Sequence, residues 1–147
     1  MRKLLVLLLP LFFTACGDGG NNLTGPTSTI PNVAGNYSGT MTASLPELGR
    51  SVSCRATTTV TQGGGGSVSI APIQLTGDCG LTSLPFGSAT IDATGSLGST
   101  TATLRESCGT YNASGSGGFF GRELRLSMVY VSSTCYNMNI TITLTRA

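Results

Sequence analysis

The sequence predicts an all-β domain, a single antiparallel eight-stranded up-and-down barrel. Apolar and polar residues alternate with a period of two along most of the chain after residue 32, a pattern typical of strands with one buried and one wet face. No segment shows helical periodicity, and short, often glycine-rich segments separate the alternating ones. A meander that closes on itself leaves no exposed sheet edge, whereas a β-sandwich is the alternative for similar strand lengths.

Three strands are predicted in the first half of the domain. Val33–Leu45 and Ser51–Gln62 alternate without interruption, and Gly63–Gly66 is a turn because four glycines cannot sustain a strand. Ser67–Thr76 is the third strand. Its alternation slips at Pro72, and a proline at such a slip indicates a bulge or a sheet edge.

The second half contains five further strands. Gly77–Phe86 has no regular pattern and is the longest predicted loop. Glycine and serine clusters at Gly95–Ser99 and Gly115–Gly118 are predicted turns. The predicted strands are Gly87–Thr94, Thr100–Arg105, Cys108–Ala113, Gly121–Val131 and Tyr136–Arg146.

The first residues form an export signal. Arg2 and Lys3 precede an apolar run, Leu4–Phe13, which at about ten residues is half the length that a membrane span needs. The small residues 14–15 then stand directly before Cys16. This arrangement resembles the lipobox of bacterial lipoproteins. The resemblance implies cleavage before Cys16 and attachment of lipid to its thiol, so the membrane lipid is the expected partner.

These features divide the chain into three parts. Residues 1–15 are the expected lipoprotein signal peptide, 16–32 the lipidated cysteine with a flexible tether of Gly, Asn, Thr and Pro, and 33–147 the barrel domain. Gly17 replaces the aspartate associated with retention in the inner membrane. The expected location is therefore the cell envelope, at the outer membrane of a bacterium with two membranes.

Four cysteines remain after Cys16, an even number in an oxidising compartment, and this predicts two disulfides. In a meander, alternate turns share one rim, and Cys54, Cys79, Cys108 and Cys135 all lie in or near turns of the same rim. The predicted bridges are Cys54–Cys79 and Cys108–Cys135, with Cys79–Cys108 as the main alternative.

Composition excludes several functions. Removing residues 1–15 leaves six basic and six acidic residues, so no basic patch for a nucleic acid remains. The chain has no histidine, which rules out Ser-His-Asp and Cys-His catalysis, and its cysteine spacing does not suit a metal. Asp78 and Glu106 flank cysteines, but they are expected to be solvated acids of loops. We expect no enzyme activity, no cofactor and no metal.

The first and last strands carry a family resemblance. Gly35-Asn36-Tyr37 on the first strand and Arg146 after the last resemble the Gly-x-Trp and the stacking basic residue of lipocalins and other calycins. The resemblance implies a barrel whose interior binds a small apolar ligand, with Arg146 over the Tyr37 ring. Inward-facing residues are the candidate ligand site: Tyr37, Met41, Leu124, Met128 and Ile140. The alternative is a solidly packed barrel that serves as a structural or interaction module of the envelope, without a ligand.

Overall fold

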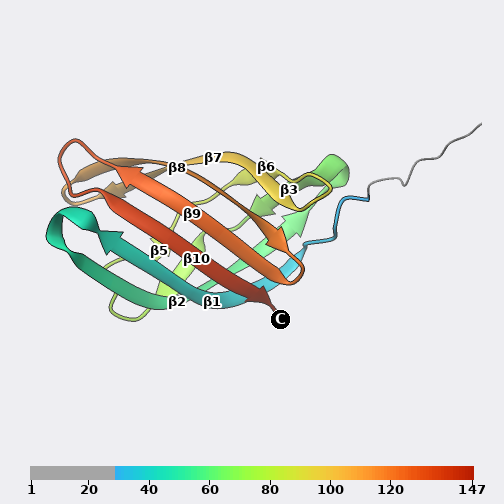
Figure 1. Ribbon diagram of the computed structural model, residues 1–147, viewed down its shortest axis with the longest axis horizontal. Helices are drawn as coiled ribbons and strands as arrows, with labels where there is room; N and C mark the ends of the chain where they lie inside the picture. Colours follow the sequence, from blue (N-terminus) through green and yellow to red (C-terminus); the bar gives the residue numbers. More distant parts are fainter. Residues whose placement is uncertain (1–28) are drawn as a thin grey trace, which may run out of the picture.

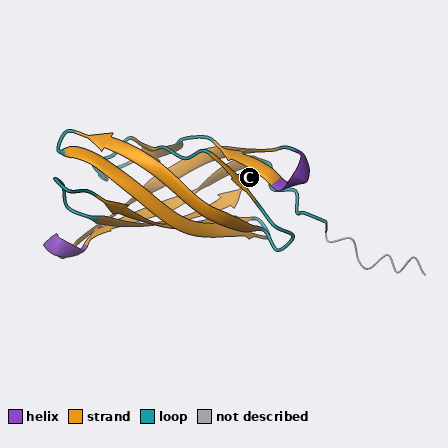
Figure 2. Cartoon of the chain, turned by 90° about the horizontal axis from the view of Figure 1, so that it is seen from above, coloured by secondary structure: helices purple, strands orange, loops and turns teal. Residues whose placement is uncertain are grey.

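The computed structural model describes residues 29–147, in which all regular structure is β except for two short 3-10 turns, η1 (Pro46–Leu48) and η2 (Gly64–Gly66) (Figures 1 and 2). The strands are β1 (Gly35–Leu45), β2 (Arg50–Gln62), β3 (Ser67–Ile70), β4 (Ile73–Thr76), β5 (Ser83–Leu84), β6 (Ser88–Thr90), β7 (Ser96–Glu106), β8 (Gly109–Phe120), β9 (Glu123–Val131) and β10 (Met138–Arg146).

The strands form one antiparallel sheet that closes into a barrel. Its order is β5-β4-β2-β1-β10-β9-β8-β7, so the first and last strands of the chain lie side by side. β3 and β4 both pair with β2 and are the two halves of one interrupted strand. β4 also pairs with β5, and β3 also pairs with β6. With each interrupted strand counted once, this is the expected eight-stranded up-and-down meander, and the sandwich alternative is not found.

Turns gather at two rims. The turns β1–β2, β4–β5, β7–β8 and β9–β10 form the rim on the left of Figure 1, which we call the cysteine rim. Disulfides Cys54–Cys79 and Cys108–Cys135 lie at or near it, the pairing that the meander predicts. The opposite rim, which we call the tether rim, holds the turns β2–β3, β6–β7 and β8–β9 together with residue 29 and the C-terminus.

Pro72 interrupts the third strand, as the slip in alternation predicts. Ala71 and Pro72 belong to neither β3 nor β4, yet the backbone stays bonded to β2 because Ala71 N–H donates to the Thr59 carbonyl at 3.0 Å. The Thr58 hydroxyl donates to the Ala71 carbonyl at 2.7 Å. A side-chain hydroxyl thus replaces a missing ladder bond, which keeps a half-buried backbone group satisfied.

The predicted turn at Gly115–Gly118 is wrong, since these residues lie inside β8. A side chain at Gly115 or Gly117 would collide with the β9 backbone, because an added Cβ would stand 3.0 Å from Met128 Cα or 3.1 Å from Leu126 Cα. These glycines allow two strands to approach closely. The turn follows instead at Gly121, whose φ of 65° favours glycine.

The predicted turn at Gly95–Ser99 is also misplaced. The turn ends at Gly95 and β7 begins at Ser96, so most of that segment is strand. Asp92 fixes the turn, because its carboxylate accepts bonds from the backbone N–H of Thr94 at 2.8 Å and of Ser96 at 3.0 Å. This aspartate turn is a stronger local signal than the glycine and serine that follow it.

The core fills the inside of the barrel. Most inward positions of the long strands are buried. Two edge-to-face aromatic pairs cross the core, Tyr37 with Phe119 at 5.9 Å and Tyr111 with Tyr130 at 6.4 Å between ring centroids. Such pairs add to the free energy that apolar burial supplies. The core therefore packs as one cluster that contacts all walls of the barrel.

Candidate functional site

The five expected ligand residues meet inside the barrel. Their exposed fractions are 2% for Tyr37 and Met128 and 0% for Met41, Leu124 and Ile140. They belong to one buried cluster in which Ile140 lies opposite Met128 in the β9–β10 ladder. Whether they bind a ligand stays a prediction, but these side chains occupy the space that a ligand would need.

Arg146 at the tether rim binds backbone carbonyls and not an aromatic ring. Arg146 lies opposite Tyr37 in the β1–β10 ladder, as the resemblance implies. Its guanidinium donates to the carbonyls of Asn32 at 2.9 Å and Ala34 at 3.4 Å, while the Tyr37 hydroxyl donates to the Val33 carbonyl at 2.8 Å. The expected stack is therefore replaced by a clamp on the chain that enters the barrel. Among residues 29–147, the cation found over a ring is Arg125, 5.5 Å from that of Phe120.

Three buried tyrosines have raised pKa values. Burial raises the pKa of Tyr130 to about 12, and among residues 29–147 its hydroxyl has the Met128 sulfur as its hydrogen-bond partner, at 3.8 Å. The pKa of Tyr37 is raised by burial despite nearby Arg146, and that of Tyr111 is raised by burial and by the charges of Glu106 and Glu47.

Alkaline pH is expected to destabilise the barrel through Tyr130. A phenol titrates near pH 10 in the unfolded chain and near 12 in the fold, so between these values the unfolded state binds fewer protons. The contribution of Tyr130 to stability should be constant below pH 10 and fall as the pH rises towards 12. Urea midpoints measured from pH 8 to 11.5 test this. The Tyr130→Phe variant should lose part of the slope, and an unchanged slope would contradict the assignment.

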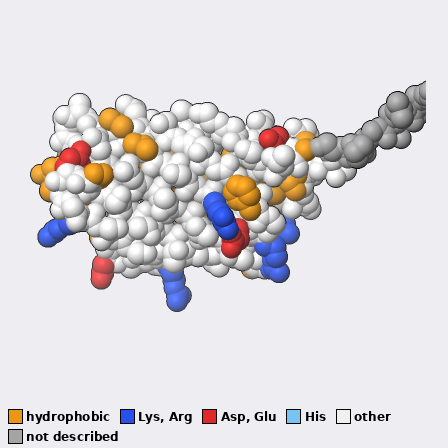
Figure 3. Space-filling model, in the orientation of Figure 1, with side chains coloured by type: hydrophobic (Ala, Val, Ile, Leu, Met, Phe, Trp, Pro, Cys, Tyr) orange, Lys and Arg blue, Asp and Glu red, His pale blue; other side chains and the backbone are white. Residues whose placement is uncertain are grey.

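The acidic residues beside the cysteines lie on the surface of the cysteine rim. Asp78 and Glu106 are exposed, and no cluster of potential metal ligands occurs within residues 29–147. The outer wall is mostly neutral and hydroxyl-bearing, and most of the face in Figure 3 carries neither charged nor hydrophobic side chains. On β1 and β10, facing pairs on this wall are Ser38 and Thr145, Thr40 and Thr143, and Thr42 and Thr141.

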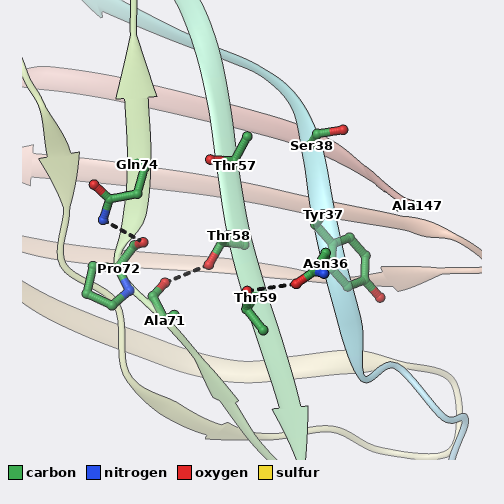
Figure 4. Close-up of a pocket in the computed structure, with 10 residues that line it drawn as sticks. All are labelled: Asn36, Tyr37, Ser38, Thr57, Thr58, Thr59, Ala71, Pro72, Gln74 and Ala147. Carbon is green, nitrogen blue, oxygen red and sulfur yellow. Dashed lines mark hydrogen bonds between the residues drawn. The ribbon is translucent and has the colours of Figure 1, made fainter.

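A first depression, of about 410 Å³, lies on the outer wall where the third strand is interrupted (Figure 4). Thr58, Ala71 and Pro72 border it, and the Gln74 side chain folds back to donate to the Pro72 carbonyl at 3.2 Å. The dashed lines in Figure 4 mark bonds from Gln74 to Pro72, from Thr58 to Ala71 and from Thr59 to Asn36. The depression follows from the proline break, and no bond is drawn to its Ser38 and Thr57 hydroxyls.

A second and larger depression, of about 860 Å³, follows the junction of the barrel that has the fewest paired residues. The ladder between the β5–β6 strand and β7 consists of a single bridge, Ile91 with Leu97, near the tether rim. Beyond that bridge the walls separate. We call this opening the seam groove. It is lined by Pro85, Phe86, Thr101, Ala102, Thr103, Asn112, Ala113, Ser114 and Val131.

The edge of β7 is free along the seam groove. Glu106 pairs with Gly109 across a two-residue turn, so from Thr100 to Glu106, beyond a shift in register, the even-numbered residues of β7 hydrogen bond to β8 and the odd-numbered ones point away from it. Thr101, Thr103 and Arg105 therefore direct their backbone N–H and C=O groups towards the groove. Within residues 29–147, no backbone group bonds to them there.

Sequence reasoning does not find the seam groove. Alternation identifies strands but not how completely neighbouring strands pair, because pairing depends on curvature and closure of the whole sheet. The available signal is Pro85, which lacks an N–H and lies within the irregular segment. The expected lipidation residue Cys16 lies outside the described residues. Among those described, no helix is long and apolar enough to cross a membrane.

The described chain is thus a small antiparallel β-barrel with a packed interior and an open seam. No protein-family model matches it, and no curated protein matches it. Among solved structures it is similar to isotype 1 transferrin binding protein B from serogroup B Neisseria meningitidis, with a TM-score of 0.54 and 17% identity. The match covers 84% of this chain but 27% of that one, so the likeness establishes a shared fold with part of a longer protein.

Proposed function

We propose that the protein is a lipid-anchored component of the bacterial cell envelope whose barrel binds another envelope protein through its outer surface. The packing of the interior carries this proposal. The five side chains expected to hold an apolar ligand are at most 2% exposed, so a ligand would have to displace the core that stabilises the fold. Recognition then falls to the outer wall and the rims.

The anchor and the location are supported by separate observations. Residues 13–16 resemble a lipobox, and two disulfides suit an exported protein. Gly17 favours the outer membrane. The shared fold with part of a protein named for binding transferrin is compatible with a barrel that serves protein recognition, and it does not indicate the partner of this chain.

Native mass spectrometry of protein extracted gently from membranes tests the proposal. We expect a polypeptide that begins at Cys16 and carries more than one covalent acyl group, since a single acyl group anchors a protein weakly. We expect no additional small molecule to be bound. The Cys16→Ala variant should lack the lipid. A lipid retained by this variant would contradict the anchor, and an apolar molecule that co-purifies reproducibly would favour the alternative in which the interior binds a ligand.

A further inference from the structure

We infer that the seam groove binds an extended segment of a partner protein, which adds a strand to the free edge of β7. The inference rests on the proposed function and specifies where the outer surface binds. Its first support is the edge itself. Thr101, Thr103 and Arg105 present backbone donors and acceptors at the repeat of a β-strand, and another extended backbone satisfies such a row of groups.

The barrel cannot fill this edge with its own neighbouring strand. Between β5 and β6 the chain passes through Pro85, Phe86 and Gly87; Pro85 has no N–H, and the Gly87 carbonyl already accepts the N–H of Ile70 at 3.0 Å. The wall opposite β7 is thus bonded towards β3 and β4. The barrel therefore closes by the bridge near the tether rim and stays open beyond it.

The side chains of the groove suit a segment with alternating residues. Ala102, Ala113 and Phe86 form the apolar part of the groove lining, on its inner side, and pack against the core. Thr101 and Thr103 are exposed on the outer side. Consecutive side chains of a strand point to opposite faces, so an occupant with apolar residues inward and polar residues outward matches both.

Charge narrows the occupant further. Arg105 is the next outward residue of β7 after Thr103, and it is exposed. The ion pair within residues 29–147 joins Arg125 to Glu123, so Arg105 has no acidic partner among the described side chains. An acidic residue of the bound segment would supply one. A second copy of the chain would not supply an acidic partner, because a two-fold antiparallel pairing of two β7 strands about Thr103 places Arg105 opposite Thr101.

The test uses the lipidated full-length protein in detergent and two synthetic peptides. The probe is an acetylated, amidated eight-residue peptide that alternates valine and threonine and has one aspartate at its amino end, to lie antiparallel to β7. The control peptide has the same sequence with N-methylated backbone nitrogens. We expect the probe to bind at least ten-fold more tightly than the control, and hydrogen exchange at residues 101, 103 and 105 to slow when it binds.

Three variants locate the binding. Thr103→Pro removes a groove-facing N–H without removing a bond to β8 and should weaken probe binding about ten-fold, whereas Thr103→Val keeps the N–H and should stay within two-fold. Arg105→Gln should weaken binding about two- to five-fold and abolish its salt dependence. Equal binding by wild type and Thr103→Pro, or no binding of the probe, would overturn the inference.

Hydrogen exchange measured without peptide shows whether another part of the chain or a second copy already covers the edge of β7. Protection of residues 101, 103 and 105 that is independent of protein concentration would mean that the chain covers its own edge, and protection that grows with concentration would mean that a second copy does; either overturns the inference. In cells, a partner cross-linked only to another face would overturn the seam site and leave the proposed function intact. A co-purified interior ligand would overturn the proposed function and leave the peptide result unchanged.

Discussion

Reducing both disulfides is expected to lower the free energy of unfolding by about 7 kcal/mol. Cys54–Cys79 and Cys108–Cys135 join residues separated by 25 and 27 positions. In the chain-entropy model, each loop of that length contributes about 3.5 kcal/mol by restricting the unfolded chain. A domain of this size is stable by roughly 5–15 kcal/mol, so the reduced chain should be marginal or unfolded at 37 °C.

Urea unfolding with and without a reductant measures the effect. The double variants Cys54→Ala/Cys79→Ala and Cys108→Ala/Cys135→Ala should each lose about half of it, since each removes one bridge without leaving a free thiol in the barrel. Peptide mapping of the unreduced protein checks the pairing. A change below about 2 kcal/mol on full reduction would mean that the two disulfides restrain the unfolded chain far less than the loop lengths predict.

Gly39→Ala is expected to destabilise the barrel by about 3 kcal/mol, the upper end of the range for overpacking. Gly39 lies on β1 opposite Leu144, where the first and last strands close the barrel. An added Cβ would collide with the carbonyl oxygen of Thr143 and stand 2.9 Å from Leu144 Cα. Both are backbone atoms, so they cannot rotate away as a flexible side chain would, and β1 must separate from β10.

Gly64→Ala is the matched control. Gly64 lies in the β2–β3 turn, where an added Cβ meets no atom within 4 Å. The same change there should alter stability by less than about 1 kcal/mol, with a small gain from the stiffer unfolded chain. Thermal unfolding of the two variants compares them directly. Similar melting temperatures would show that β1 and β10 are not as close as the structure places them.

The fold is largely predictable because one face of each strand is wet. Unbroken alternation predicts β1, β2, β9 and β10 to within two residues at each end. The sequence pattern gives wrong strand limits where a glycine is needed for close packing of two strands. Gly115 and Gly117 resemble a turn in sequence, yet they sit mid-strand because β9 passes too close for side chains. A single sequence does not distinguish these two uses of glycine.

The candidate site is less predictable than the fold. The alternation of inward and outward residues along each strand correctly places Tyr37 and Met128 inside the barrel. Whether small residues such as Ala56 leave a pocket depends instead on the distance between the walls of the barrel. Ala56 is fully buried, which fits walls drawn together. The seam groove arises from a missing ladder rather than from a residue type, so no motif marks it.

The Arg146 clamp has a mechanical consequence for an anchored protein. Tension from a tether attached at Cys16 would enter at the tether rim and act along β1, which runs away from that rim between β2 and β10. Force in this direction shears the two flanking ladders, so their bonds share the load instead of opening singly. Bonds from Arg146 to Asn32 and from Gln62 to the Pro31 carbonyl, at 2.9 and 3.0 Å, would take the strain before β1 does. These side-chain bonds therefore hold the segment before β1 at the point where the tension would enter the barrel.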